Sequence, residues 1–267
     1  MEPKLTFDQN VVFYDRHRPT YGARIYQDVL AYSGFGHGKQ AIEVGCGTGQ
    51  ATRPFLDAGG NVTAVELGEN LTAFTRHKFA GYHNFEVVNA DFTQFSAAQD
   101  SIDLVYSATA FHWVSHEKNN MLGHRLAHGL LKPGGALAIW WNNPRGTKDA
   151  ALHNEIQACY MKYAPANAEQ KQQKMENSEK WYKDRHGYEE KILTQLGFGA
   201  IESKLYQGYR TFTGEAYVEL LHTYSDHMSL PDALRLPLFD AIGECVTKRG
   251  GITLQDTVDL YMARKQA

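Results

Sequence analysis

The first half of the chain alternates short apolar runs with segments of helical length. Runs of the length of a strand occupy residues 40–44, 61–66, 85–88, 102–106 and 136–141. Segments of helical length lie at residues 49–58, 70–79 and 117–131, and Lys132 to Gly135 forms a stop-and-turn signal. Because strands that alternate with helices form parallel βαβ units, the pattern predicts an open sheet covered on both faces. Ligands bind such sheets at the edge where the strands end.

The second half departs from this rhythm. Residues 147–188 are rich in Gln, Lys, Glu and Asn, with large aromatic residues between them. A disordered linker rarely carries so many rings, so we predict helices that form a cap, although residues 164–173 fit a solvated surface excursion nearly as well. Beyond them the pattern predicts strands at 201–209 and 256–263, and helices that open at Thr213 and Pro231 and end at 221 and 248.

These patterns divide the chain into a core and an insertion. The core comprises residues 1–145 and 188–267, and the helical cap insertion comprises residues 146–187. A second contribution to the cap or to a substrate pocket is predicted near residues 209–254. With 267 residues, 43% of them hydrophobic, the chain is long enough for one α/β domain with such insertions.

Charge and composition narrow the classes of partner. The formal net charge is only -3 and no long basic run is present, which argues against nucleic acid as a partner and favours a small molecule. No apolar run has the length of a signal peptide or of a membrane span. The 3 cysteines cannot pair completely and show no Cys-x-x-Cys spacing. We therefore predict a cytoplasmic protein, monomeric or homodimeric, that does not contact the membrane.

The strongest motif is a glycine-rich loop. Residues 43–50 read Glu-Val-Gly-Cys-Gly-Thr-Gly-Gln, directly after a predicted strand and before a predicted helix. Glycines permit positive φ and close backbone approach, and a helix N-terminus offers unpaired amides to a polar, partly anionic ligand. The dinucleotide fingerprint needs a third glycine where Gln50 stands. That difference, and the absence of a Tyr-x-x-x-Lys pair, argue against a nicotinamide-dependent oxidoreductase.

Acidic residues follow the next two predicted strands. Glu66 ends the second strand, where a carboxylate can accept hydrogen bonds from both hydroxyls of a ribose. Asp91 follows the third strand and can accept from an adenine amine, although Asp-Phe in a loop is by itself more often a turn or a helix cap. Together with the glycine loop, these residues predict a site for an adenosine-containing cofactor.

These motifs resemble those of a known family. Residues 43–49, Glu66, residues 90–92 and residues 131–135 resemble successive motifs of the class I methyltransferases, and residues 14–19 and 110–113 resemble the branch related to trans-aconitate methyltransferase. The resemblance covers about residues 7–143 and a closing strand near Tyr261. It implies an α/β Rossmann-like seven-stranded methyltransferase sheet, mostly parallel with one antiparallel C-terminal strand, plus helical cap insertions.

The resemblance also implies an activity. S-adenosylmethionine would give its methyl group by in-line displacement to a small-molecule acceptor, for which a carboxylate is one candidate, and S-adenosylhomocysteine would be the product. The alternatives are a non-catalytic S-adenosylmethionine-binding scaffold and, less favoured, the oxidoreductase. Cofactor-binding residues carried over from the family are Tyr14, Arg18, Tyr21, Glu43, Gly45, Cys46, Gly47, Gly49, Glu66, Leu67, Asp91, Phe92, Ala108 and His112.

Each group of these residues has an implied role. The three glycines would line the methionine portion, and Glu43 would order the loop or the cofactor's amino group. Glu66 would hold the ribose, while Leu67, Asp91 and Phe92 would frame the adenine. Ala108 would lie near the methionine moiety. Tyr14, Arg18 and Tyr21 would form an N-terminal flap, with Arg18 as a candidate for the cofactor's carboxylate.

His112 is the candidate catalytic residue, because imidazole titrates near neutrality. A structural or cofactor-orienting role is the alternative that we favour for it. Candidate acceptor-binding residues are Trp113, Trp141, Asn143 and Arg145, although an exposed loop explains the last two equally well. At least one of the adjacent Trp140 and Trp141 is expected simply to pack, because neighbouring strand residues face opposite ways. His112, His116, His124 and His128 complete no known zinc signature, so we predict no metal site.

Overall fold

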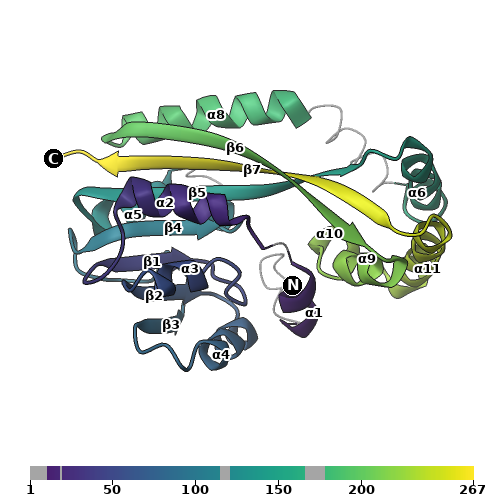
Figure 1. Cartoon of the computed structure of the whole chain (residues 1–267), viewed down its shortest axis with the longest axis horizontal. Coiled ribbons are helices and arrows are strands. Elements are labelled where there is room, and N and C mark those ends of the chain that lie inside the picture. Colours follow the sequence, from purple (N-terminus) through teal and green to yellow (C-terminus); the bar gives the residue numbers. More distant parts are fainter. Residues whose placement is uncertain (1–10, 19, 115–120, 166–177) are drawn as a thin grey trace. The chain divides into compact units, whose positions relative to one another are not determined.

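The computed structural model describes residues 11–18, 20–114, 121–165 and 178–267, which form two compact units (Figure 1). The first unit comprises Met1–Arg18, Asn143–Asp184 and Gln207–Thr257. The second unit comprises Pro19–Asn142, Arg185–Tyr206 and Val258–Ala267. We describe each unit by itself.

Seven strands form one sheet in the order β3-β2-β1-β4-β5-β7-β6. Their bounds are β1 Gln40–Val44, β2 Asn61–Glu66, β3 Phe85–Asn89, β4 Ile102–Ala108, β5 Leu131–Thr147, β6 Phe198–Phe212 and β7 Ile252–Lys265. The ladders from β3 through β5 are parallel, and β7 runs against β4 and β6 (Figure 1). The predicted seven-stranded sheet with an antiparallel C-terminal strand is therefore confirmed.

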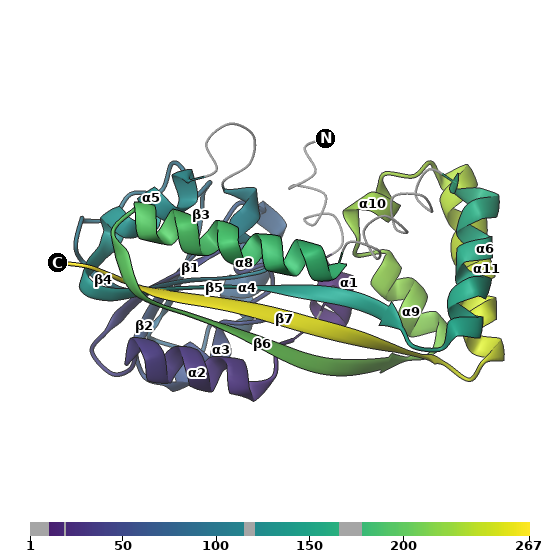
Figure 2. The same ribbon diagram turned by 90° about the horizontal axis from the view of Figure 1, so that it is seen from above.

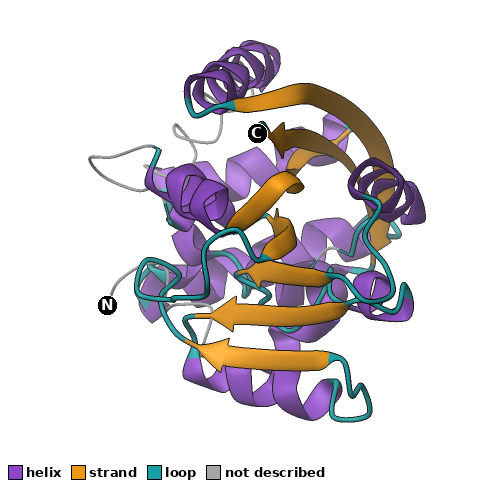
Figure 3. Cartoon of the chain, turned by 90° about the vertical axis from the view of Figure 1, so that its left-hand side faces the viewer, coloured by secondary structure: helices purple, strands orange, loops and turns teal. Residues whose placement is uncertain are grey.

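The second unit has a hydrophobic core on each face of the sheet. Alternate residues of a strand enter opposite cores, as Ala41 and Ile42 of β1 do. Helices α2 (Ala23–Ser33) and α3 (Arg53–Asp57) cover one face, and α5 (Leu122–Leu130) and α8 (Ser178–Gln195) cover the other (Figure 2). Figure 3 shows the strands with helices on both sides. Helix α4 (Glu69–Lys78) and the short 3-10 helix η2 (Phe111–Trp113) complete the unit.

The first unit contains mainly helices. These are α1 (Val11–His17), α6 (Ala150–Tyr163), α9 (Gly214–Leu221), α10 (Ser225–Met228) and α11 (Asp232–Lys248). Helices α6, α9 and α11 share one buried hydrophobic cluster, which includes Ile156, Leu220 and Ile242. In that unit the Sγ atoms of Cys159 and Cys245 lie 3.8 Å apart as free thiols. In the described part of the chain, every helix is too short or too polar to cross a bilayer.

Several predicted boundaries are confirmed. The strands β1 and β2 begin and end where the apolar runs do. The Thr213 hydroxyl accepts a hydrogen bond from the Ala216 amide at 3.2 Å, so Thr213 caps α9 as predicted. Pro231 directly precedes α11, which ends at the predicted Lys248. The cap role of the helical segments stays a prediction.

Other boundaries differ from the prediction. The predicted helix at 49–58 is reduced to Arg53–Asp57, because the glycine loop occupies its first residues. Strand β5 begins at Leu131, so the predicted turn at 132–135 lies inside it as an irregularity in its pairing with β4. Strands β6 and β7 are longer than predicted, and α8 continues to Gln195, past the expected end of the insertion. Residues 117–120 of the predicted helix at 117–131 lie outside the described residues.

Replacing Gly214 by alanine should destabilise the first unit. A Cβ atom at Gly214 would overlap the Thr247 hydroxyl and lie 2.5 Å from the Gly243 carbonyl oxygen of α11. Overpacking of this kind costs about 1–3 kcal/mol. We expect Gly214→Ala to lower the free energy of unfolding by that amount in urea titrations. Gly208→Ala is the matched control, because nothing lies within 4 Å of its added Cβ; equal stability of the two variants would contradict the packing.

Candidate active site

The loop after β1 has a backbone that only glycines adopt readily. Gly45, Gly47 and Gly49 have φ angles of 69°, 58° and 81°. A Cβ at Gly49 would overlap the ring of Phe79, and a Cβ at Gly45 would lie 2.5 Å from the Cβ of Ala110. The glycine loop therefore needs glycine both for its backbone angles and for its close neighbours.

Glu66 binds this loop to the loop after β2. Its Oε2 accepts the Gly47 amide at 2.8 Å, and its Oε1 accepts the Gly68 amide at 2.9 Å. The side chain is 7% exposed. A carboxylate has about four lone-pair sites, so the group can accept more hydrogen bonds than these two. Glu66 thus presents a fixed pair of acceptors at the carboxyl end of β2.

Helix α4 holds the outer side of the glycine loop. The Thr75 hydroxyl donates to the Gly47 carbonyl at 2.7 Å, and Lys78 Nζ donates to the Thr48 carbonyl at 2.9 Å. Sequence reasoning missed both residues, because neither belongs to a recognisable motif. Cys46 is buried within the loop, and burial raises the pKa of its thiol well above the usual value. The Cys46 thiol is therefore neutral, and contact of Cys46 with a cofactor stays a prediction.

Glu43 orders the interior of the loop. It is almost completely buried, and its Oε2 accepts the Thr52 hydroxyl at 2.7 Å and the Tyr106 hydroxyl at 3.0 Å. Burial raises the pKa of Glu43 to about 7; the two hydrogen bonds lower it, and the charge of Glu66 raises it further. These bonds connect Glu43 to Thr52, just after the glycine loop, and to β4; its predicted roles in ordering the loop or binding a cofactor's amino group stay predictions.

The residues after β3 and β2 frame the same edge of the sheet. Asp91 Oδ1 accepts the Thr93 amide at 2.9 Å and the Thr93 hydroxyl at 2.8 Å, so this oxygen closes an Asx turn. The turn that the sequence left open as an alternative is therefore present. Phe92 is buried, and Leu67 is half-buried. Their contact with adenine stays a prediction.

The end of β4 contains a strained residue that sequence reasoning missed. Thr109 follows Ala108 and has a φ angle of 58°, which is costly for a β-branched side chain. Its hydroxyl is bonded to the Tyr21 hydroxyl at 2.8 Å and accepts the Asn142 amide at 3.0 Å. Strain of this kind persists where surrounding bonds enforce it, and it concentrates at functional sites. Tyr21 thus belongs to this edge of the second unit.

His112 lies in η2, two residues after the Ala110 that contacts Gly45. The indole Nε1 of Trp141 donates to His112 Nδ1 at 3.1 Å. An indole nitrogen can only donate, so Nδ1 accepts and the neutral ring carries its proton on Nε2. His112 is therefore arranged as a hydrogen-bond donor through Nε2. Because Nδ1 is occupied by this bond and Nε2 carries a proton, the geometry argues against His112 as a general base. It supports the alternative in which His112 orients a bound molecule.

The comparisons with known proteins agree with this geometry. Residues 42–139 match the family described as "Methyltransferase domain". A malonyl-[acyl-carrier protein] O-methyltransferase from Pectobacterium atrosepticum is 31% identical over 129 residues, 47% of each chain. A methyltransferase-like protein from Schizosaccharomyces pombe is 25% identical over 85% of this chain and 80% of that one.

A solved structure shows the same fold. The phosphoethanolamine N-methyltransferase 2 of Haemonchus contortus, in complex with phosphomonomethylethanolamine and S-adenosylhomocysteine, aligns with a TM-score of 0.54 and 15% identity. The alignment covers 97% of this chain and 58% of that chain. The chain spans about half, or less, of the length of the curated relatives that it matches first. Residues 42–139 therefore resemble a methyltransferase domain in sequence, and the described part of the chain shares the fold of that solved structure.

Other predicted site residues lie in the first unit or lack a described side chain. Tyr14 and Arg18 belong to the first unit, where the Arg18 guanidinium donates to the Thr223 carbonyl at 3.1 Å. It also lies 5.0 Å from the centre of the Tyr14 ring. Asn143 also belongs to the first unit, and its carbonyl accepts the Thr257 hydroxyl at 3.4 Å. The flap role of Tyr14 and Arg18 and the acceptor role of Asn143 stay predictions.

The adjacent Trp140 and Trp141 lie on opposite faces of the sheet, as the alternation of side chains along a strand requires. Trp140 is fully buried in the core on one face, while Trp141 belongs to the core on the other. Trp113 is half-buried, with its ring 4.8 Å from that of His112. The side chain of Arg145 lies outside the described residues, and so does His116. The described residues contain no group of three or more ligands able to hold a metal.

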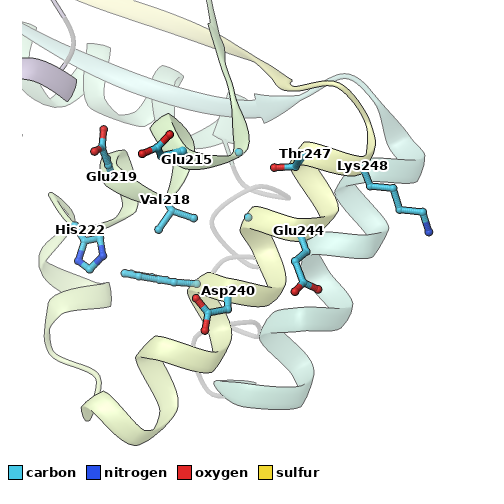
Figure 4. A pocket seen from close by; sticks show the side chains of 11 residues that line it. Glu215, Val218, Glu219, His222, Asp240, Glu244, Thr247 and Lys248 are labelled. Carbon is cyan, nitrogen blue, oxygen red and sulfur yellow. The ribbon is translucent and has the colours of Figure 1, made fainter.

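A cavity of about 710 Å³ lies between α9 and α11 in the first unit (Figure 4). Its floor is apolar, with Val218 and Phe239. Its charged lining is mostly acidic: Glu215, Glu219, Asp240 and Glu244 surround it, with Lys248 as the basic exception. The sequence analysis singled out none of these residues. The excess of negative charge makes this cavity a poor place for an anionic acceptor.

The buried Glu43 should make stability depend on pH. Its folded pKa of about 7 exceeds the ordinary 4.5, so the folded state binds more protons and stability falls as pH rises between these values. Glu43→Gln keeps an oxygen acceptor and removes the titration. We expect its free energy of unfolding, relative to the unsubstituted protein, to rise by up to about 3 kcal/mol across that interval and then stay constant. A pH-independent difference in urea titrations would contradict the assignment.

Proposed function

We propose that the protein transfers a methyl group from S-adenosylmethionine to a carboxylate of a small-molecule acceptor, leaving S-adenosylhomocysteine and a methyl ester. The observation that carries this proposal is the Glu66 carboxylate, with both oxygens held by backbone amides at the end of β2. Two adjacent ribose hydroxyls fit that pair of acceptors. The methyltransferase family match over residues 42–139 supports the reaction class.

The residues of the second unit fit the cofactor. Glu66 would hold the ribose, and the glycine loop would leave the methionine portion room to approach the backbone, since no Cβ projects from Gly45, Gly47 or Gly49. Phe92 and Leu67 would lie against the adenine. Bound there, S-adenosylmethionine supplies an electrophilic methyl group on a positively charged sulfur.

A carboxylate acceptor agrees with the hydrogen bond at His112. An amine, phenol or carbon acid usually loses a proton before it accepts a methyl group, whereas a carboxylate needs no base. His112 Nδ1 accepts from Trp141, which leaves Nε2–H as a donor. Such a donor can orient a carboxylate oxygen. The malonyl-[acyl-carrier protein] O-methyltransferases among the relatives, whose name specifies transfer to oxygen, support the same choice.

The rate of methyl transfer would then depend on how the acceptor oxygen is placed relative to the methyl group. One C–O bond forms as the S–C bond breaks, and the electron pair of that bond stays on sulfur. His112 and the surrounding aromatic residues would hold the acceptor oxygen in line and exclude water. Alignment of two bound reactants is worth roughly 7–11 kcal/mol of the barrier, so no acid–base step is required.

Glu66→Gln should weaken cofactor binding. The amide places a donor group where two backbone amides and the ribose hydroxyls need acceptors, and hydrogen bonds to a charged group contribute about 1.5–3 kcal/mol. We expect the Kd for S-adenosylhomocysteine, measured by calorimetry, to rise about 10- to 100-fold. Glu69→Gln is the control, because Glu69 is exposed at the start of α4. An unchanged Kd for Glu66→Gln would refute the ribose role.

The product should be an ester that base cleaves. We would incubate the protein with S-adenosylmethionine carrying a labelled methyl group and with acceptors such as a malonyl thioester and trans-aconitate. Hydroxide converts a carboxyl methyl ester into volatile methanol, whereas methyl groups on nitrogen, carbon or an ether oxygen remain. We expect the transferred label to become volatile after treatment with base. Transfer of base-stable label would exclude the carboxylate acceptor and leave the cofactor assignment intact.

A further inference from the structure

The indole ring of Trp141 contacts both His112 and Arg185. Trp141 lies in β5 and is 5% exposed. Its Nε1 donates to His112 Nδ1 at 3.1 Å. The guanidinium of Arg185 lies over the ring, 4.4 Å from its centre. The indole therefore stands between a cation and the imidazole that we place at the acceptor.

Arg185 is a charged residue in an interior position. It comes from α8, and its side chain is 17% exposed. Its Nη1 lies 3.5 Å from Asp259 Oδ2, and Asp259 is fully buried and also accepts the Tyr261 hydroxyl at 3.3 Å. Burial lowers the pKa of Arg185, and the charge of Asp259 opposes that shift. Desolvating two such charges costs about as much as their attraction returns, so stability alone does not explain the pair.

A cation on the face of an indole has a direct effect on its N–H group. The ring attracts the guanidinium electrostatically. Linked polar contacts polarise one another in a medium of low dielectric constant, so the positive charge makes the indole N–H a stronger donor. The acceptor of that donor is His112 Nδ1. The contact with Arg185 therefore favours the tautomer of His112 that carries its proton on Nε2.

We propose that Arg185, held by Asp259, is a positioning residue that acts through Trp141 to fix the Nε2–H tautomer and the ring orientation of His112. This inference rests on the proposed function, in which His112 orients the carboxylate of the acceptor. Arg185 belongs to no motif that the sequence offered, and it lies in α8, outside the segment that matches the methyltransferase family. A residue of α8 would thus influence His112, which lies inside that segment.

The tautomer can be measured directly by NMR. Protein labelled with ¹⁵N in histidine gives long-range ¹H–¹⁵N correlations that distinguish a protonated ring nitrogen from an unprotonated one. His112→Gln identifies the resonances of His112 among the 12 histidines. At about pH 8, above the ordinary range of histidine titration, we expect His112 in the protein to show protonated Nε2 and unprotonated Nδ1 only.

Two variants remove the arrangement in different ways. Trp141→Phe keeps a ring and removes the N–H donor. The double variant R185Q/D259N removes the cation and its partner together, which avoids leaving a buried charge uncompensated. In both we expect the loss of the single tautomer, with resonances that report exchange between the Nε2–H and Nδ1–H forms. Arg264→Gln is the matched control, because Arg264 lies 5.0 Å from the centre of the Tyr32 ring elsewhere in the second unit.

The outcomes separate this inference from the proposed function. Titration of the unsubstituted protein with S-adenosylhomocysteine tests the cofactor site, and failure to bind would overturn the proposed function. If the ligand binds and R185Q/D259N keeps the single Nε2–H tautomer, the role of Arg185 is wrong. The same holds if His112 in the unsubstituted protein carries its proton on Nδ1, or if Arg264→Gln changes the tautomer as much as R185Q/D259N does.

Discussion

The interaction on which the candidate site depends is the pair of hydrogen bonds from the Gly47 and Gly68 amides to Glu66. They connect the loop after β1 to the loop after β2, two strands that pair in parallel. Thr75 and Lys78 of α4 bind the same glycine loop from outside. Each amide that points at Glu66 is one that a strand or helix has left without a backbone partner. One buried carboxylate therefore connects the loops of two βα units, and in the proposed function it also accepts the hydroxyls of a ribose.

A second carboxylate lies close to the first, and the fold treats it differently. Glu43 is buried without a backbone amide, so burial and the charge of Glu66 raise its pKa to about 7. Its neighbours Thr52 and Tyr106 donate hydroxyl hydrogen bonds to it. Near neutral pH Glu43 is therefore only partly ionised, which reduces its repulsion with Glu66. Glu43 is thus bonded to hydroxyl groups inside the protein, whereas Glu66 is bonded to the amides of two loops.

Local sequence signals predicted the parts of the molecule that local interactions determine. The apolar runs of β1 and β2 end at turns, and the positive φ angles of the loop after β1 favour glycine whatever surrounds it. The long β5 and the extension of α8 depend on pairing and packing across the sheet, which periodicity does not report. Thr109 adopts positive φ because the Tyr21 hydroxyl and the Asn142 amide hold it. No sequence pattern indicates the positive φ angle of Thr109. The same holds for the contact between Arg185 of α8 and Trp141 of β5.

The proposed transfer to a carboxylate depends on the Trp141 hydrogen bond to His112 and on the chemistry of carboxylates. The central claim is that Glu66 binds a ribose, and a crystal structure of the protein with S-adenosylhomocysteine tests it most directly. The account predicts both ribose hydroxyl oxygens about 2.6–3.0 Å from the Glu66 carboxylate, with the Gly47 and Gly68 bonds retained. A ligand bound elsewhere, or a ribose that does not contact Glu66, would contradict it.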